Sequence, residues 1–130
     1  SLTTIIVNHD IEESLEISDR IMIINDGIID AIDTPENIYK NPKNLSTAQL
    51  FGDVTSLAIE NKKRYIRPEN IKIVEKSPYD VEVKRSFYLG EKYRISAKLG
   101  DDIIDLYHNT NLMQGSNLYI DFNKEDILNF

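Results

Sequence analysis

The chain opens with a short apolar run, and the polar segment that follows has the residues typical of a helix start. Residues 3–7 (Thr-Thr-Ile-Ile-Val) are mostly β-branched, which predicts a short buried strand. Asp10 is followed three residues later by Glu13, the spacing of a capping box, so a helix should begin there. The apolar stripe of that helix is short, and we expect the helix to stop near Asp19.

The strongest hairpin signal in the chain is Asp26-Gly27, because a tight two-residue turn needs residues that accept positive φ. Farther on, Thr34 followed by Pro35 is typical of a helix cap and a first helical position. The elements predicted here are strands at 20–25 and 28–32 and helical stretches from Thr34 to Asn41 and at 46–51.

From Asp53 onward the pattern is that of an all-β domain. The predicted strands are 54–59, 64–66, 71–74, 80–89, 92–99, 103–107 and 117–122. Short strands separated by turn residues suggest a small barrel or sandwich, and a five-stranded OB-like barrel fits the length. The predicted fold class is therefore α+β, with the tail of an α/β domain at 1–52 followed by a small OB-like barrel at 53–130.

The first of these parts should belong to a larger α/β domain. One crossover helix cannot cover both faces of a parallel sheet, so the core of this half should lie elsewhere. The chain also enters strand-like sequence by Thr3, and it is expected to be a fragment of a longer protein.

Charge and composition limit the classes of function that the chain can have. The chain has 130 residues, 15 basic and 22 acidic side chains and a net charge of −7, which argues against a sequence-independent nucleic-acid binder. The acidity is concentrated in residues 1–52, which hold 9 acidic and 3 basic groups. Without cysteine there is no disulfide framework or thiolate site. The longest aliphatic run is only residues 21–24, and no signal peptide is visible.

A resemblance to a known family rests on motifs in both halves. In the first half they are residues 4–15 (TIIVNHDIEESL), 18–21 (SDRI), Asp26-Gly27, 34–39 (TPENIY), Asn41-Pro42, Ala48 and Phe51-Gly52. They resemble the switch-histidine region of ABC-transporter ATPases, in the form found in importers of sugars, polyamines, ferric iron or molybdate. In the second half they are residues 66–71 (IRPENI), 88–90 (YLG) and 127–130 (ILNF). These are similar to the TOBE (transport-associated OB) regulatory domain of the same subfamily.

The resemblance gives His9 a catalytic role, that of the switch histidine that senses the γ-phosphate of ATP. Phosphoryl transfer to water needs donors around the γ-phosphate oxygens, and a neutral imidazole at a strand end can supply one. A histidine that merely ends a strand beside a helix cap is the alternative. The neighbouring motif residues Asn8, Asp10 and Glu13 favour the switch role.

The motifs that bind nucleotide do not occur in this sequence. There is no Gly-x-x-x-x-Gly-Lys-Ser/Thr phosphate loop, no Ser-Gly-Gly signature and no apolar strand ending in Asp-Glu. We therefore expect ATP and Mg²⁺ to be cofactors of the intact protein only, and the chain alone to be inactive, with no cofactor-binding or metal-binding residues of its own.

The resemblance also implies partners and a location. These are a second copy in a homodimer, membrane permease subunits, a cytoplasmic position at the inner face of the membrane and a possible solute or regulator at the barrel, without nucleic acid. Independently of the resemblance, we expect the strand at residues 3–7 to pair with a second copy, since its sheet neighbours should be missing.

Four other polar groups are expected to be structural. Asp19-Arg20 should be an ion pair or a helix-to-strand corner, and His108 ordinary surface. Arg67-Pro68-Glu69 should form a turn that sets strand direction, and Lys62-Lys63-Arg64 a solvated turn.

Two other functions compete with the ATPase interpretation. A free-standing OB-like module could bind a ligand or an oligonucleotide if its aromatic and basic residues cluster on one surface. A stand-alone hydrolase that uses His9 is weaker, because the sequence has no nucleophile elbow, metal cluster or paired carboxylates.

Overall fold

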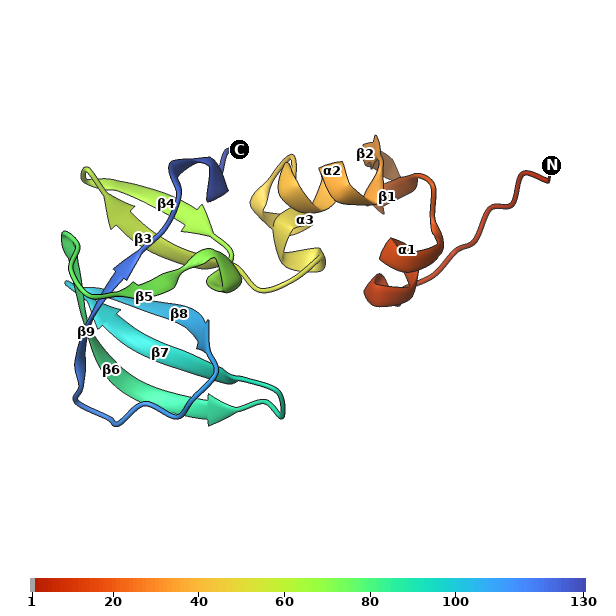
Figure 1. The fold of residues 1–130 in the computed structure, drawn as a ribbon. Coiled ribbons are helices and arrows are strands. Elements are labelled where there is room, and N and C mark those ends of the chain that lie inside the picture. The colour runs from red at the N-terminus through yellow and green to blue at the C-terminus, as the bar shows by residue number, and fades with distance from the viewer. Residues whose placement is uncertain (1) are drawn as a thin grey trace. The chain divides into compact units, whose positions relative to one another are not determined.

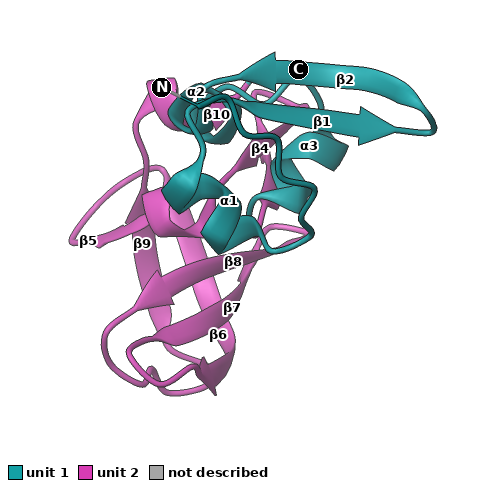
Figure 2. Cartoon of the chain, turned by 90° about the vertical axis from the view of Figure 1, so that its right-hand side faces the viewer, with its two compact units in different colours: residues 1–52, 129–130 teal, residues 53–128 magenta. Residues whose placement is uncertain are grey.

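The computed structural model describes residues 2–130 and divides into two compact units. One unit holds the chain up to Gly52 together with Asn129–Phe130, and the other is Asp53–Leu128 (Figure 2). None of the helices in residues 2–130 has the length and apolar character needed to cross a membrane.

The first unit begins with an extended segment and a short helix (Figure 1). Helix α1 spans Ile11–Ile17, and the Asp10 side chain caps it as predicted by accepting from the Glu13 amide. The strand predicted at residues 3–7 is wrong, because residues 2–10 have no regular structure. A strand needs a hydrogen-bonded neighbour, and no described strand pairs with this segment. Its apolar side chains are exposed, Val7 at 98%.

The predicted hairpin is present. Strands β1 (Ile21–Asn25) and β2 (Ile28–Asp33) pair antiparallel around Asp26-Gly27, both with positive φ. The cross-strand pairs Met22–Ile32 and Ile24–Ile29 consist of exposed apolar side chains.

Two short helices follow the hairpin. Helix α2 (Pro35–Lys40) has Thr34 as its cap, as predicted, and ends at Asn41. Helix α3 (Leu45–Leu50) is one residue ahead of the prediction and is capped by Asn44, whose side chain accepts from the Thr47 amide at 2.8 Å. The hydrophobic cluster of this unit is small: it consists of Ile23, Ile38 and Phe51 with partly buried neighbours such as Ile11 and Leu15, and Ala48 is buried as well.

The second unit confirms the predicted β domain. All seven predicted strands are present within one or two residues of their expected ends. The observed strands are β3 (Thr55–Ile59), β4 (Lys62–Ile66), β5 (Lys72–Val74), β6 (Tyr79–Tyr88), β7 (Tyr93–Leu99), β8 (Asp102–His108), β9 (Asn117–Asp121) and the two-residue β10 (Ile127–Leu128).

These strands form two sheets, where a single five-stranded barrel was expected. A five-stranded antiparallel sheet has the order β5-β9-β6-β7-β8 and curls as a half-barrel, and a three-stranded sheet has the order β10-β4-β3 (Figure 1). The sequence shows where strands begin and end, but the division into sheets depends on pairing between distant segments.

A bulge in β6 decides which of its side chains face the core. Val83 pairs with Ala97 and Arg85 with Ser96, so Lys84 is an extra residue on β6. Before the bulge Val81 and Val83 are buried. Because side chains alternate along a strand, the extra residue places Arg85 and Phe87 on the outer face instead of in the core.

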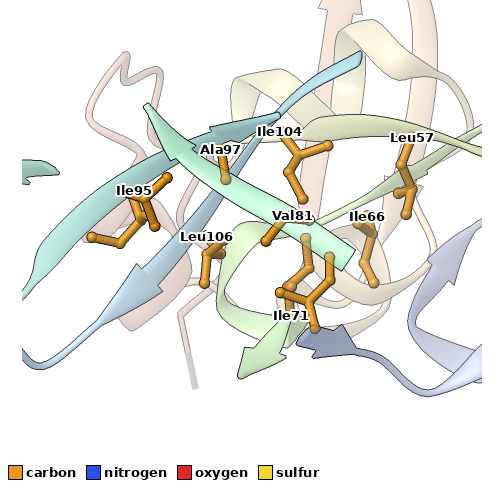
Figure 3. Packing of buried hydrophobic residues seen from close by; sticks show 10 residues of the cluster. Leu57, Ile66, Ile71, Val81, Ile95, Ala97, Ile104 and Leu106 are labelled. Atoms are coloured by element: carbon orange, nitrogen blue, oxygen red, sulfur yellow. The ribbon is translucent and has the colours of Figure 1, made fainter. Parts of the chain in front are cut away.

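The core of this unit lies between the sheets. Leu57 and Ile66 come from the three-stranded sheet and pack with side chains of the five-stranded sheet, as Figure 3 shows. Those from the larger sheet include Val81, Val83, Ile95, Ala97, Ile104, Leu106 and Ile120, each at most 1% exposed.

Candidate functional site

The residues around His9 form a local hydrogen-bonded turn. Asp10 accepts from the Glu13 amide at 3.0 Å, and its own amide donates to the Asn8 side-chain oxygen at 2.9 Å. The Asn8 amide group also donates to the Glu13 carboxylate, and the Ser14 hydroxyl donates to the Asp10 carbonyl at 2.6 Å. Residues on both sides of His9 are therefore held, while His9 itself occupies the middle of the turn.

The His9 side chain is exposed. Its ring makes no hydrogen bond with any residue in the part of the chain that the structure describes. The imidazole nitrogens are thus accessible to a group from outside these residues. The partner that would fix the tautomer, expected for a histidine that acts on a phosphate, is not among residues 2–130.

A cluster of basic and aromatic side chains lies on the outer face of β6, β7 and β8 in the other unit. Phe87, Arg94 and Tyr107 are opposite one another in register across the three strands. The guanidinium carbons of Arg85 and Arg94 lie 4.6 and 4.9 Å from the Phe87 ring centroid, and the Lys92 ammonium lies 3.8 Å from that of Tyr107. These are cation–π distances, so basic and aromatic side chains that are scattered in the sequence cluster here.

Two carboxylates, those of Asp53 and Asp105, lie beside this cluster. The Tyr107 hydroxyl donates to the Asp53 carboxylate at 2.5 Å, and burial, followed by this bond, raises the pKa of Tyr107. Burial also raises the pKa of Asp105, which Arg94 lowers and Asp53 raises to smaller extents. Among the described residues, neither Arg85, Lys92 nor Arg94 forms an ion pair within 4 Å.

The other residues singled out in the sequence have structural positions. Asp19 and Arg20 lie at the corner between α1 and β1, one of the two expected roles. His108 ends β8, where its Nδ1 accepts from the Thr110 amide at 3.2 Å.

Of the other two expectations, one is confirmed and one needs correction. Arg67-Pro68-Glu69 is part of a turn, as predicted: Arg67 precedes a 3-10 turn (Pro68–Asn70), is 2% exposed and donates to the Asp53 carbonyl at 3.4 Å. Lys62-Lys63-Arg64 lies in β4 and not in a turn, because the preceding Glu60 and Asn61 form the reversal.

Comparison with known proteins extends this picture. No family model matches the chain. It is 34% identical to the spermidine/putrescine import ATP-binding protein PotA of Spiroplasma citri, an alignment that covers 97% of the chain and 44% of that protein. The identity to PotA of Bacillus thuringiensis subsp. konkukian is 30%, over 96% of the chain and 42% of the relative. PotA of Oleidesulfovibrio alaskensis is 29% identical over 82% of the chain and 29% of its own length.

The chain is homologous to PotA import ATP-binding proteins.

The chain spans less than half the length of these curated relatives, and it corresponds to a C-terminal part of them. The resemblance to ABC-importer ATP-binding proteins that the motifs indicated is therefore confirmed. The relatives are named as ATP-binding proteins, and the chain covers only part of them.

The cluster of basic and aromatic side chains on β6, β7 and β8 was not predicted from the sequence. Arg85, Phe87 and Arg94 were visible as residues, but the bulge at Lys84 that turns them to one face has no sequence signature strong enough to find it. No group of three or more His, Asp or Glu side chains in residues 2–130 is placed to hold a metal ion.

Proposed function

We propose that the chain is the C-terminal regulatory part of the ATP-binding subunit of an ABC importer, which couples ATP hydrolysis to solute uptake. Residues 1–52 would be the end of the ATPase domain and residues 53–130 an OB-like TOBE domain. The observation that carries the proposal is the 34% identity to a spermidine/putrescine import ATP-binding protein across 97% of the chain. From the names of the relatives, the solute would be a polyamine.

His9 is the residue of this chain that we propose to act in hydrolysis. In the intact subunit its imidazole would donate to the γ-phosphate of ATP and stabilise the charge that develops during attack by water. The exposed ring between two held neighbours supports this role, since a donor must be accessible and fixed in place. ATP and Mg²⁺ would be bound by other segments of the subunit, and the chain alone would be inactive.

The exposed apolar surface of the first unit is evidence that this unit is part of a larger α/β domain. Leu2, Ile5 and Val7 are at least 90% exposed, and the apolar pairs on the outer face of the β1–β2 hairpin are also in water. Surface of this kind normally packs against another part of a protein. The remainder of an ATPase domain would cover it.

The same proposal sets the partners and the location. A second copy of the subunit would complete the ATP sites, and membrane permease subunits would bind the dimer at the cytoplasmic face. The β domain would regulate the dimer and could take up a small solute or regulator.

The test is the ATPase activity of the full subunit that contains this chain. His9→Ala should lower kcat about 100-fold or more, as the loss of one charge-stabilising donor does, while ATP binding is retained. The matched control is His108→Ala, which removes a histidine from the β domain and should leave kcat unchanged. Equal activity of the His9→Ala variant and the parent would rule out the switch role.

The solute class is tested by uptake. Cells that depend on this subunit should accumulate labelled spermidine or putrescine, and an excess of unlabelled maltose or ferric citrate should not compete. Competition by a sugar or an iron complex, with no effect of polyamine, would exclude a polyamine importer.

A further inference from the structure

The outer face of β6, β7 and β8 has the composition of a binding surface. We call Arg85, Phe87, Lys92, Arg94 and Tyr107 the arginine–aromatic face. The arginine and aromatic side chains of this face are of the types enriched at protein interfaces and at their energetic centres. Phe87, Arg94 and Tyr107 are half-buried and Arg85 and Lys92 are exposed, so the face is accessible in the described chain.

Stacking on an aromatic ring restricts the conformations of the arginine side chains of this face. Arg85 and Arg94 approach the same Phe87 ring, with guanidinium carbons 4.6 and 4.9 Å from its centroid. An arginine stacked on a ring loses less freedom when it binds a carboxylate, and its fork can bind both carboxylate oxygens. Two like charges near one ring repel each other, and an anionic partner would relieve that repulsion.

The carboxylates already on this face do not neutralise it. Asp53 accepts from the Tyr107 hydroxyl, and Asp105 is partly buried beside Arg94. Neither approaches a cation of the face within ion-pair distance.

The complementary surface is helix α1. Glu12 and Glu16 are exposed, lie one turn apart on the same side of the helix and form no ion pair with any of residues 2–130. Like charges four residues apart destabilise a helix, and the last turn of α1 has no basic residue. Two cations from another molecule would therefore stabilise α1.

The spacing of the two carboxylates on α1 also matches the spacing of the two arginines on the sheet. Residues four apart on a helix have Cβ atoms about 6 Å apart. Arg85 pairs with Ser96, so Arg94 is its diagonal neighbour across β6 and β7, and such neighbours are about 7 Å apart. Two carboxylates of one helix can thus reach two guanidinium groups at the same time.

We propose that the arginine–aromatic face of one copy of this chain binds helix α1 of a second copy, with Arg85 and Arg94 paired to Glu12 and Glu16. The inference goes beyond the proposed function, because neither the ATP site nor the permease takes part in it. Exposed ion pairs are individually weak, so the association should be weak and strongly reduced by salt.

Sedimentation equilibrium of the 130-residue chain tests the proposal. At 50 mM NaCl the chain should form dimers or larger species at high micromolar to millimolar concentration, and 500 mM NaCl should raise the dissociation constant about tenfold or more. Arg85→Gln with Arg94→Gln should abolish this association. The matched control is Lys62→Gln with Lys63→Gln, which removes the same charge from exposed positions on β4 and should leave the association unchanged.

A charge exchange separates specific pairing from general attraction. Glu12→Arg with Glu16→Arg should remove self-association, as should Arg85→Glu with Arg94→Glu. The chain that carries all four changes should associate again. A parent chain that stays monomeric at 1 mM and 50 mM NaCl would overturn the proposal.

Failure of the four-fold variant to associate, with each pair of changes folded by circular dichroism, would also overturn it. Association that persists at 500 mM NaCl and is lost in Ile5→Lys with Val7→Lys would identify contact through the apolar segment instead, because apolar burial is not screened by salt. The ATPase test of His9 is unaffected by any of these results.

Discussion

At the scale of single residues, the surroundings of Asp105 in β8 disfavour the ionised form of its carboxyl. It is partly buried, and burial raises the pKa of its carboxyl, while Arg94 partly offsets this. A carboxyl with a raised pKa in the folded state binds its proton more tightly there than in the unfolded chain. Its contribution to stability is present below the unfolded pKa and is lost as the pH rises through the folded pKa.

We therefore predict that Asp105→Asn changes the pH dependence of stability. Asparagine cannot ionise, so the free energy of unfolding of the variant should rise relative to that of the parent as the pH increases from about 3 to 7. Urea unfolding followed by circular dichroism at several pH values measures this difference. Asp101→Asn, in the turn before β8, removes the same charge and is the control. Parallel curves for Asp105→Asn and the parent would contradict the prediction.

Arg67 shows what a sequence cannot reveal at this scale. The sequence places it correctly ahead of Pro68, but an arginine is usually exposed, and only tertiary structure shows it 2% exposed with the Asp53 carbonyl as an acceptor. His9 is the opposite case. Its place before the helix cap was predictable from local residues, whereas its role depends on groups outside this chain.

At the scale of elements, the features predicted correctly are those set by neighbours in sequence. Asp10 and Thr34 cap their helices, and Asp26-Gly27 forms its turn, because the relevant hydrogen bonds and φ angles are local. The division of the β domain into two sheets and the bulge in β6 depend on pairing between distant strands. The segment at residues 3–7 has the composition of a strand but no described strand to pair with.

One turn was missed because it contains no glycine. Glu60 and Asn61 connect β3 to β4 with φ of 51° and 59°, the angles of a two-residue turn with both residues left-handed. Asparagine accepts this conformation, while a long side chain such as glutamate is strained by about 1 kcal/mol or more.

Glu60→Asn should consequently stabilise the β domain, by about 0.5–1 kcal/mol in the free energy of unfolding. Chemical denaturation of the variant and the parent measures the change. Glu75→Asn makes the same replacement at an exposed position without positive φ and should not stabilise. A gain of equal size in both variants would show that loss of charge, and not the turn, is responsible.

At the scale of the whole molecule, the two units differ in how much core they bury. The second unit has ten buried side chains in one cluster, and the first has three. The first unit also exposes much of its apolar surface, including Val7 at 98% and Ile28 at 70%. A smaller core offsets less of the conformational entropy of folding, so the first unit should be the less stable of the two.

We predict that residues 53–128 fold alone and that the first unit is much less stable than the second. The β fragment should unfold cooperatively on heating and retain dispersed amide NMR signals, because its core is complete within its own strands. In the 130-residue chain, amide hydrogens of the first unit should exchange with deuterated water much faster than those of β6, β7 and β8. Equal protection of the two units would contradict the prediction.

The bulge at Lys84 also has an evolutionary consequence. Deletion of this single codon would leave the reading frame intact and make Val83 and Arg85 neighbours, so that all the cross-strand pairs and both faces of β6 would be kept. A one-residue deletion or insertion elsewhere in β6, with no bulge to absorb it, would instead exchange the two faces and turn guanidinium groups toward the interior. The bulge is therefore a position at which β6 can change its length in evolution while the core and the outer face stay as they are.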